Sequence, residues 1–132
     1  MLEPTFRPLI TIIRLTPDRS LVEVALDLDG RLATGFADIV DDNSLLAACK
    51  GTVAAAQGLL PEHMVLTMDW AKRIERDGEP DVINSAVTLT VAGESHSENL
   101  LGAAYVRHDP EVAAVRATLD GLTRRLVGYI FD

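Results

Sequence analysis

The sequence predicts an α+β fold: two pseudo-symmetric β-β-(β)-α repeats, with a mostly antiparallel sheet and the two helices on one face. Three observations predict it: segments in which apolar and polar residues alternate, two helical segments with the same apolar spacing, and identical residues shared between those helices. A chain of 132 residues has the usual length of one domain. We therefore expect a single domain over residues 1–132, with repeat one at about 10–60 and repeat two at about 63–127.

Alternation and a turn signal indicate the strands of the first unit. Apolar residues occupy every second position from Val22 to Leu28, which is the period of a half-buried strand. Asp29-Gly30 follows, and such a pair favours a hairpin because glycine tolerates a positive φ. We expect strands near 10–16, 21–28 and 32–40.

The second unit repeats this pattern with a longer hairpin connection. Val87, Leu89 and Val91 alternate with threonines, and Gly93 follows them as Gly30 follows the first strand pattern. The polar stretch 94–99 then leads into another apolar segment. We expect strands near 63–73, 83–92 and 99–107, a turn at 77–80, and a short strand in the apolar tail 127–131.

The two helical segments match each other best. Asn43 and Asp109 suit a helix N-cap because their side-chain oxygens accept from free backbone N–H groups, and Pro110 suits the first helical position. After each cap the apolar residues follow a spacing of 3, 4, 3, 4, which forms one helix face. They are Leu46, Cys49, Val53, Ala56 and Leu60, and then Val112, Val115, Leu119, Leu122 and Leu126. At the same offset of 66 positions three pairs are identical, which favours duplication over coincidence: Ala47/Ala113, Ala48/Ala114 and Thr52/Thr118.

Charge and composition disfavour several classes of protein. The formal net charge is −8, whereas nucleic acids and anionic membrane surfaces are bound by basic faces, so we expect neither partner. We assign the basic pairs at 72–73 and 124–125 to solvated surface. A single cysteine cannot form an internal disulfide, and the first residues lack the pattern of a signal peptide, so we expect a cytoplasmic protein.

Oxygen-bearing side chains gather before the first helix, and the matching loop of the second unit contains His108-Asp109, a combination that can act as a base. The acidic group can supply the ligands of a hard cation. Helix capping and the helix dipole explain the same residues, and the EF-hand spacing is not present, so we assign no metal site. The speculative ligand-binding residues of the two loops are Asp38, Asp41, Asp42, Asn43, Arg107 and His108.

The sequence contains no Gly-rich phosphate loop, Ser-centred elbow or Cys-x-x-Cys motif, which argues against an enzyme. We assign no catalytic residue and no cofactor. Cys49 occupies an apolar helix position, where a buried structural thiol is the usual outcome. Trp70 alternates with Met68 and Leu66, which favours packing in the core or in an interface.

The segment Gly102–Leu126, GAAYVRHDPEVAAVRATLDGLTRRL, resembles the closing strand and helix of the C-terminal regulatory domain of 2-isopropylmalate synthase. That domain also has two β-rich units that each end in a helix, and its members pair through it. The family's helix commonly ends in Ala-Leu-Asn-Arg, where this chain has Gly121-Leu122-Thr123-Arg124, and the family's catalytic barrel is not within these residues. The resemblance therefore implies the architecture and the pairing, but no leucine site. A related group of free-standing, uncharacterised bacterial proteins fits equally well.

Two hypotheses of function follow. The first is a non-catalytic regulatory, ligand-binding or assembly module that forms a homodimer, with a small-molecule ligand at the pre-helix loops or the subunit interface. The alternative is a small enzyme or accessory protein that uses Asp and His residues of the same loops. The dimer is expected because the sheet face opposite the helices carries small, weakly polar residues. They include Ala25, Ala33, Ala37, Thr88, Thr90 and Ala104.

Overall fold

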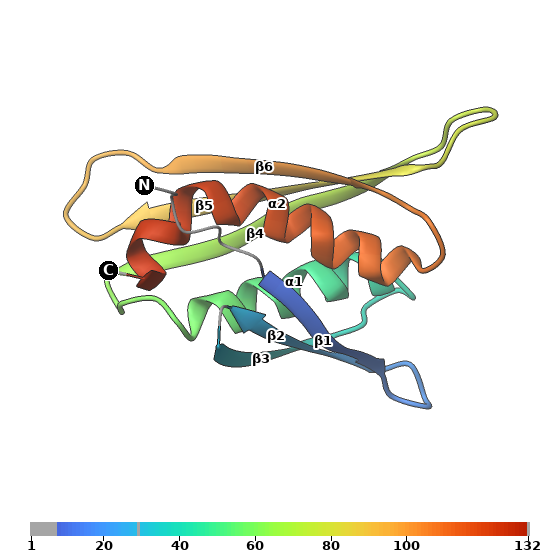
Figure 1. Ribbon diagram of the computed structural model, residues 1–132, viewed down its shortest axis with the longest axis horizontal. Helices are drawn as coiled ribbons and strands as arrows, with labels where there is room; N and C mark the ends of the chain where they lie inside the picture. Colours follow the sequence, from blue (N-terminus) through green and yellow to red (C-terminus); the bar gives the residue numbers. More distant parts are fainter. Residues whose placement is uncertain (1–7, 29, 132) are drawn as a thin grey trace.

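The computed structural model describes residues 8–28 and 30–131, and within them three strands and a helix are followed by three more strands and a helix (Figure 1). The elements are β1 (Pro8–Leu15), β2 (Leu21–Leu28), β3 (Arg31–Asp38), α1 (Ser44–Gln57), β4 (Met64–Ile74), β5 (Val82–Val91), β6 (Glu98–Tyr105) and α2 (Pro110–Phe131). The predicted strands agree with these bounds to within two residues. The alternation of apolar and polar residues was therefore a sound guide to the strands.

The strands form two antiparallel sheets, ordered β1-β2-β3 and β4-β5-β6. The predicted α+β class is confirmed. The expected single sheet with both helices on one face is replaced by two sheets, each with its own helix on its inward face. The two helices lie side by side between the sheets (Figure 1). Alternation identifies the buried face of each strand, but it carries no information on which strands of different units pair.

The end of the chain differs from its prediction. α2 continues to Phe131, so the short strand expected at 127–131 is wrong. An apolar run of five residues is compatible with either a strand or a helix, and here it follows a helix with no proline to end it.

The hydrophobic core lies between the two sheets and draws on both units. Inward residues of the central strands β2 and β5 pack against the facing sides of α1 and α2. Val53 and Leu119, which occupy matching helix positions, are 7% and 6% exposed, so their predicted burial is confirmed. The side chain of Leu126 lies outside those that the structure describes. Most of the described members of the predicted apolar series are buried: Cys49, Val53, Ala56, Val115, Leu119 and Leu122.

In each unit one glycine sets the distance between the sheet and its helix. A Cβ added at Gly35 in β3 would lie 2.1 Å from the Gly51 carbonyl oxygen of α1. A Cβ added at Gly102 in β6 would lie 2.0 Å from the Ala117 carbonyl oxygen of α2. Each glycine therefore permits a backbone approach that no other residue allows.

The strand registers of the two units also correspond. Gly35 pairs with Val24 on β2, and Gly102 pairs with Ser85 on β5. One residue further along, Ala25 therefore matches Ala86. A register irregularity falls at Ile10/Ile12 in β1 and at Met68/Trp70 in β4, opposite these matching positions. These correspondences support the duplication hypothesis, and the superposition of residues 22–60 on 84–126 stays a prediction.

The outward sheet faces differ from the expected surface of small residues. Ala33, Ala37 and Ala104 pack towards the core, because they pair with the inward residues Leu26, Val22 and Ile83. The predicted outward orientation of these three alanines is therefore wrong. Large apolar side chains are exposed on the outward faces instead, and they include Leu32, Phe36, Trp70, Leu101 and Tyr105.

Candidate functional site

The two strand-to-helix loops lie at the same end of the molecule, where α1 and α2 both begin (Figure 1). The Ser44 hydroxyl of α1 donates a hydrogen bond of 2.7 Å to the Glu111 carboxylate of α2. Further along the pair, the Cys49 thiol approaches the Ala114 carbonyl oxygen at 3.5 Å. The helices therefore run in parallel, and the positive ends of both helix dipoles face the same side.

The first loop is occupied by its own turn and cap. Asp41 and Asp42 have φ angles of 54° and 57°, a left-handed conformation that Asp adopts more readily than most residues. The Asn43 side chain accepts from the Leu46 N–H at 3.0 Å, as predicted for a cap. Asp38 ends β3 and is exposed. Within the described part of the chain, no group of three or more His, Cys, Asp or Glu side chains is placed to hold a metal ion.

The second loop ends in the predicted cap of α2. Asp109 accepts hydrogen bonds from the Glu111 N–H at 2.9 Å and the Val112 N–H at 3.4 Å. A hydrogen bond with the Glu111 side chain, together with these two N–H groups, holds the pKa of Asp109 below its ordinary value and outweighs the effect of partial burial. Asp109 therefore stays ionised, next to the positive end of the helix dipole.

A hollow of about 390 Å³ opens beside the start of α2. Its lining brings together Arg107 and His108, two of the predicted site residues, and adds Arg116, nearly two turns into the helix. The predicted residues of the first loop, 38 and 41–43, are not part of this lining. The hollow therefore holds two arginine side chains against the one carboxylate of Asp109, and this excess of positive charge favours a small anion. The lining residues are Tyr105, Arg107, His108, Asp109, Val112, Ala113 and Arg116.

Sequence reasoning missed Tyr105, Val112 and Arg116. Arg116 stands 66 positions after Lys50, so the two residues occupy matching positions of α2 and α1. The spacing of four between Val112 and Arg116 places both on one side of the helix, so the sequence did hold a signal for this pair.

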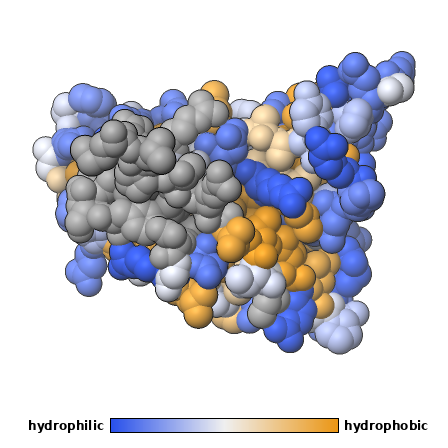
Figure 2. All heavy atoms as spheres, in the orientation of Figure 1, coloured by the Kyte–Doolittle hydropathy of each residue, from blue (hydrophilic) through white to orange (hydrophobic). Residues whose placement is uncertain are grey.

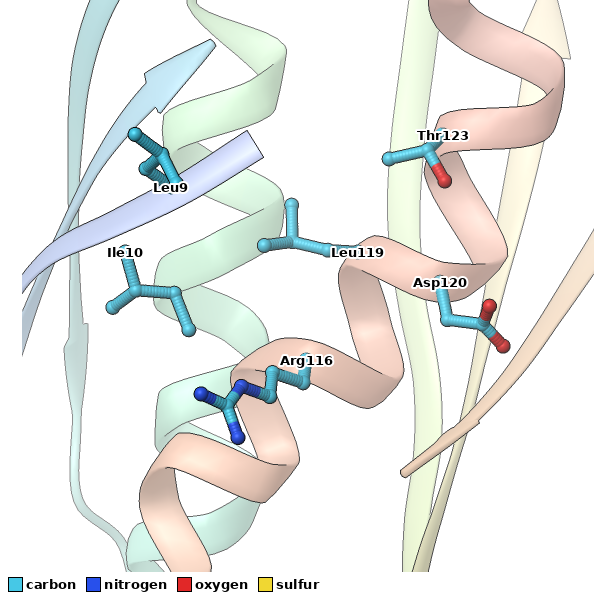
Figure 3. Close-up of a pocket in the computed structure, with 6 residues that line it drawn as sticks. All are labelled: Leu9, Ile10, Arg116, Leu119, Asp120 and Thr123. Atoms are coloured by element: carbon cyan, nitrogen blue, oxygen red, sulfur yellow. The ribbon is translucent and has the colours of Figure 1, made fainter. Parts of the chain in front are cut away.

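A second hollow, of about 370 Å³, lies between β1 and α2. Figure 3 shows Leu9 and Ile10 on the β1 side and four side chains of α2 on the other. In Figure 2 apolar side chains gather over β1 next to this region. Its α2 lining consists of Arg116, Leu119, Asp120 and Thr123. Arg116 therefore borders both hollows.

Cys49 is the expected buried structural thiol. Burial raises its pKa, although hydrogen bonds from Thr118 and Ser85 act in the opposite direction. The Thr118 hydroxyl donates to the Ala114 carbonyl oxygen, and the Ser85 hydroxyl lies 2.9 Å from the Thr118 oxygen, close enough to donate to it. The polar atoms around this thiol therefore pair with each other between α1, α2 and β5.

In each basic pair one arginine side chain forms an ion pair. Arg73 forms an ion pair of 2.8 Å with Asp81, and Arg125 forms another with Glu98. Among the described helices, none has the length and apolar character that a membrane crossing requires.

Comparison with known proteins returns no matching family model and no matching curated relative. The resemblance of Gly102–Leu126 to the regulatory domain of 2-isopropylmalate synthase therefore stays a prediction.

Proposed function

We propose that this chain is a non-catalytic regulatory or assembly module that acts by pairing with a second copy of itself. The observation that carries this proposal is the apolar surface on the outward sheet faces. Leu32 on the first sheet is 74% exposed and Leu101 on the second is 64% exposed, whereas the buried core lies between the sheets. Clusters of exposed large apolar side chains on a soluble domain are typical of protein interfaces.

Sedimentation equilibrium tests the pairing. The chain has a mass of 14.3 kDa, and we expect twice this mass at micromolar concentration. A single species of monomer mass up to about 100 µM, a range in which even weak specific pairs associate, would contradict the proposal.

The ligand part of the proposal concerns the hollow beside the start of α2. Arg107 and Arg116 supply positive charge there, so the ligand class is a small anion such as a carboxylate or a phosphate. Thermal-shift measurements with a panel of small carboxylates and inorganic phosphate test this part. We expect Arg116→Ala to abolish a stabilising shift that Lys50→Ala, at the matching position of α1, leaves intact. Equal responses in the two variants would contradict the site.

The alternative of a small enzyme gains no specific support. Asp109 and Asn43, the loop residues nearest to the helix starts, accept hydrogen bonds from the first backbone N–H groups of the helices. These contacts explain both residues through helix stability.

A further inference from the structure

We infer that two copies of this chain meet through the outward face of β4, β5 and β6, with a side chain of each copy in a hollow of the other. The inference rests on the proposed self-association and names the surface that mediates it. We call this surface the second-sheet face. Its members pair across the three strands in rows and point away from α2. Three rows form the part of this face that contacts the second copy. They are Trp70, Ala86 and Leu101; Lys72, Asn84 and Ala103; and Ile74, Val82 and Tyr105.

The shape of this face is self-complementary. Leu101 and Tyr105 project from β6 on either side of the small residue Ala103. A hollow of about 310 Å³ is lined by Trp70, Leu101 and Ala103 among others, and a smaller one of about 180 Å³ by Ala103 and Tyr105 among others. The face therefore presents both a projecting side chain, Leu101, and a hollow beside it at Ala103. A twofold interface requires such a pair, because the same surface of each copy must fit the other.

A twofold axis between two of the rows matches these features. The axis lies between the two facing sheets, perpendicular to the strands and midway between the row of Trp70 and the row of Lys72. The strands of the second copy therefore run opposite to those of the first, and each of these rows faces the other row of the partner copy. Leu101 of each copy then enters the hollow at Ala103 of the other copy. Lys72 of each copy comes over the Trp70 ring of the other, next to Asp69. Both a cation–π contact and an opposite charge favour this arrangement.

The charges on the second-sheet face are available for such contacts. Asp69 accepts a hydrogen bond from Thr88, which holds its carboxylate on this face. Lys72 has no ion-pair partner among the described residues. One acid and one base flanking an aromatic centre attract a copy related by the twofold axis.

The outward face of the first sheet lacks both properties. The matching position of Ala103 is Phe36, one residue after Gly35 as Ala103 follows Gly102, so a large side chain stands where the second sheet has a small one. Arg14 is already paired with Glu23 at 2.9 Å. A second copy therefore fits the second-sheet face better.

Two substitutions on this face, with one control, test the inference by sedimentation equilibrium. Leu101→Asp places a charge in the hollow, and we expect association at least about 100-fold weaker. Ala103→Phe copies the first sheet and fills the hollow, and we expect association at least about 10-fold weaker. Leu32→Asp, the same kind of change on the first sheet, should leave the dissociation constant within about 2-fold of the original.

The outcomes separate the surface from the proposed function. An original chain that stays monomeric overturns both. A dimer that survives Leu101→Asp and Ala103→Phe unchanged overturns the surface alone. If circular dichroism shows that Leu101→Asp does not fold, Ala103→Phe decides, because Ala103 is exposed and its change leaves the core intact. Trp70 is the only tryptophan, so its fluorescence should shift to shorter wavelength as the dimer forms, and an unshifted spectrum in the dimer also contradicts the inference.

Discussion

The two units make the same contacts on their inward sides and different ones on their outward sides. Inside, Gly35 and Gly102 bring each sheet against its helix, and Thr52 and Thr118 each donate to the carbonyl oxygen four residues before them. Outside, the ion pair of Arg14 and Glu23 in the first unit is matched by Lys72 and Asn84 in the second. Close packing restricts which residues can occupy the inward side, whereas the outward side tolerates different residues in the two units. We therefore expect inward substitutions to act alike in both units and outward ones to act differently.

The glycine pair should give the largest effect on stability. Gly35→Ala and Gly102→Ala each place a Cβ about 2 Å from a helix carbonyl oxygen, and backbone cannot yield as a flexible side chain can. We expect each to lower the free energy of unfolding by roughly 3 kcal/mol or more, measured by urea denaturation. Gly58→Ala is the control, because its Cβ would lie 3.4 Å from the nearest oxygen and its φ is −63°, so we expect a change below about 1 kcal/mol. A large loss for only one of the pair would show that the two packing contacts are not equivalent.

Truncation of the matching core residues should give the next effect. Leu119→Ala should cost about 2–3 kcal/mol, at the lower end of the usual range, because the site adjoins the hollow between β1 and α2. Val53→Ala removes fewer methyl groups and should cost about 1–2 kcal/mol. Chemical denaturation measures both, and a loss under about 1 kcal/mol for Leu119→Ala would mean that this helix face does not pack in the core.

The two helix caps should give smaller and distinguishable effects. Asn43→Ala and Asp109→Ala should each cost about 0.5–2 kcal/mol at neutral pH. The folded pKa of Asp109 is lowered, so its contribution is complete above the ordinary carboxyl pKa of about 3.9 and is lost as the pH falls through the lower folded value. The cost of Asp109→Ala should therefore shrink in acid, whereas the cost of Asn43→Ala should not.

Asp109→Asn provides the matched control for this comparison, because it keeps a cap acceptor but cannot titrate. Its unfolding free energy should lack the acid-dependent part that Asp109 contributes. An Asp109→Ala cost that is the same at pH 3 and pH 7 would exclude the proposed role of the lowered pKa.

The smallest effect concerns Cys49, which has no cysteine counterpart in the second unit: Val115 stands at the matching position. Burial raises its thiol pKa, so little thiolate forms at pH 8, and the side chain is also shielded from reagents. We expect no reaction with a thiol reagent in the native protein and one equivalent of reaction after denaturation. Rapid labelling of the native protein would show that the contact between α1 and α2 opens.

Much of the fold could be predicted from the chain alone. Alternation identified the strands, and the apolar spacing after Asn43 and Asp109 identified both helices and their caps, because these features depend on residues close in sequence. Local patterns also gave the burial of Cys49 and Leu119. The strand predicted at 127–131 failed because a short apolar run fits either structure.

Only the tertiary structure decided how these elements combine. The division into two sheets depends on which strands pair. The hollow at Arg107 and Arg116 depends on the position of the end of β6 relative to the start of α2. The sheet face on which Ala33 and Ala104 lie likewise followed from their register with the neighbouring strands. By itself the sequence determined the elements, their caps and most of their buried positions, since each is fixed by contacts within a few residues. The arrangement of sheets, hollows and outward faces was decided by contacts between distant residues, which a local pattern does not encode.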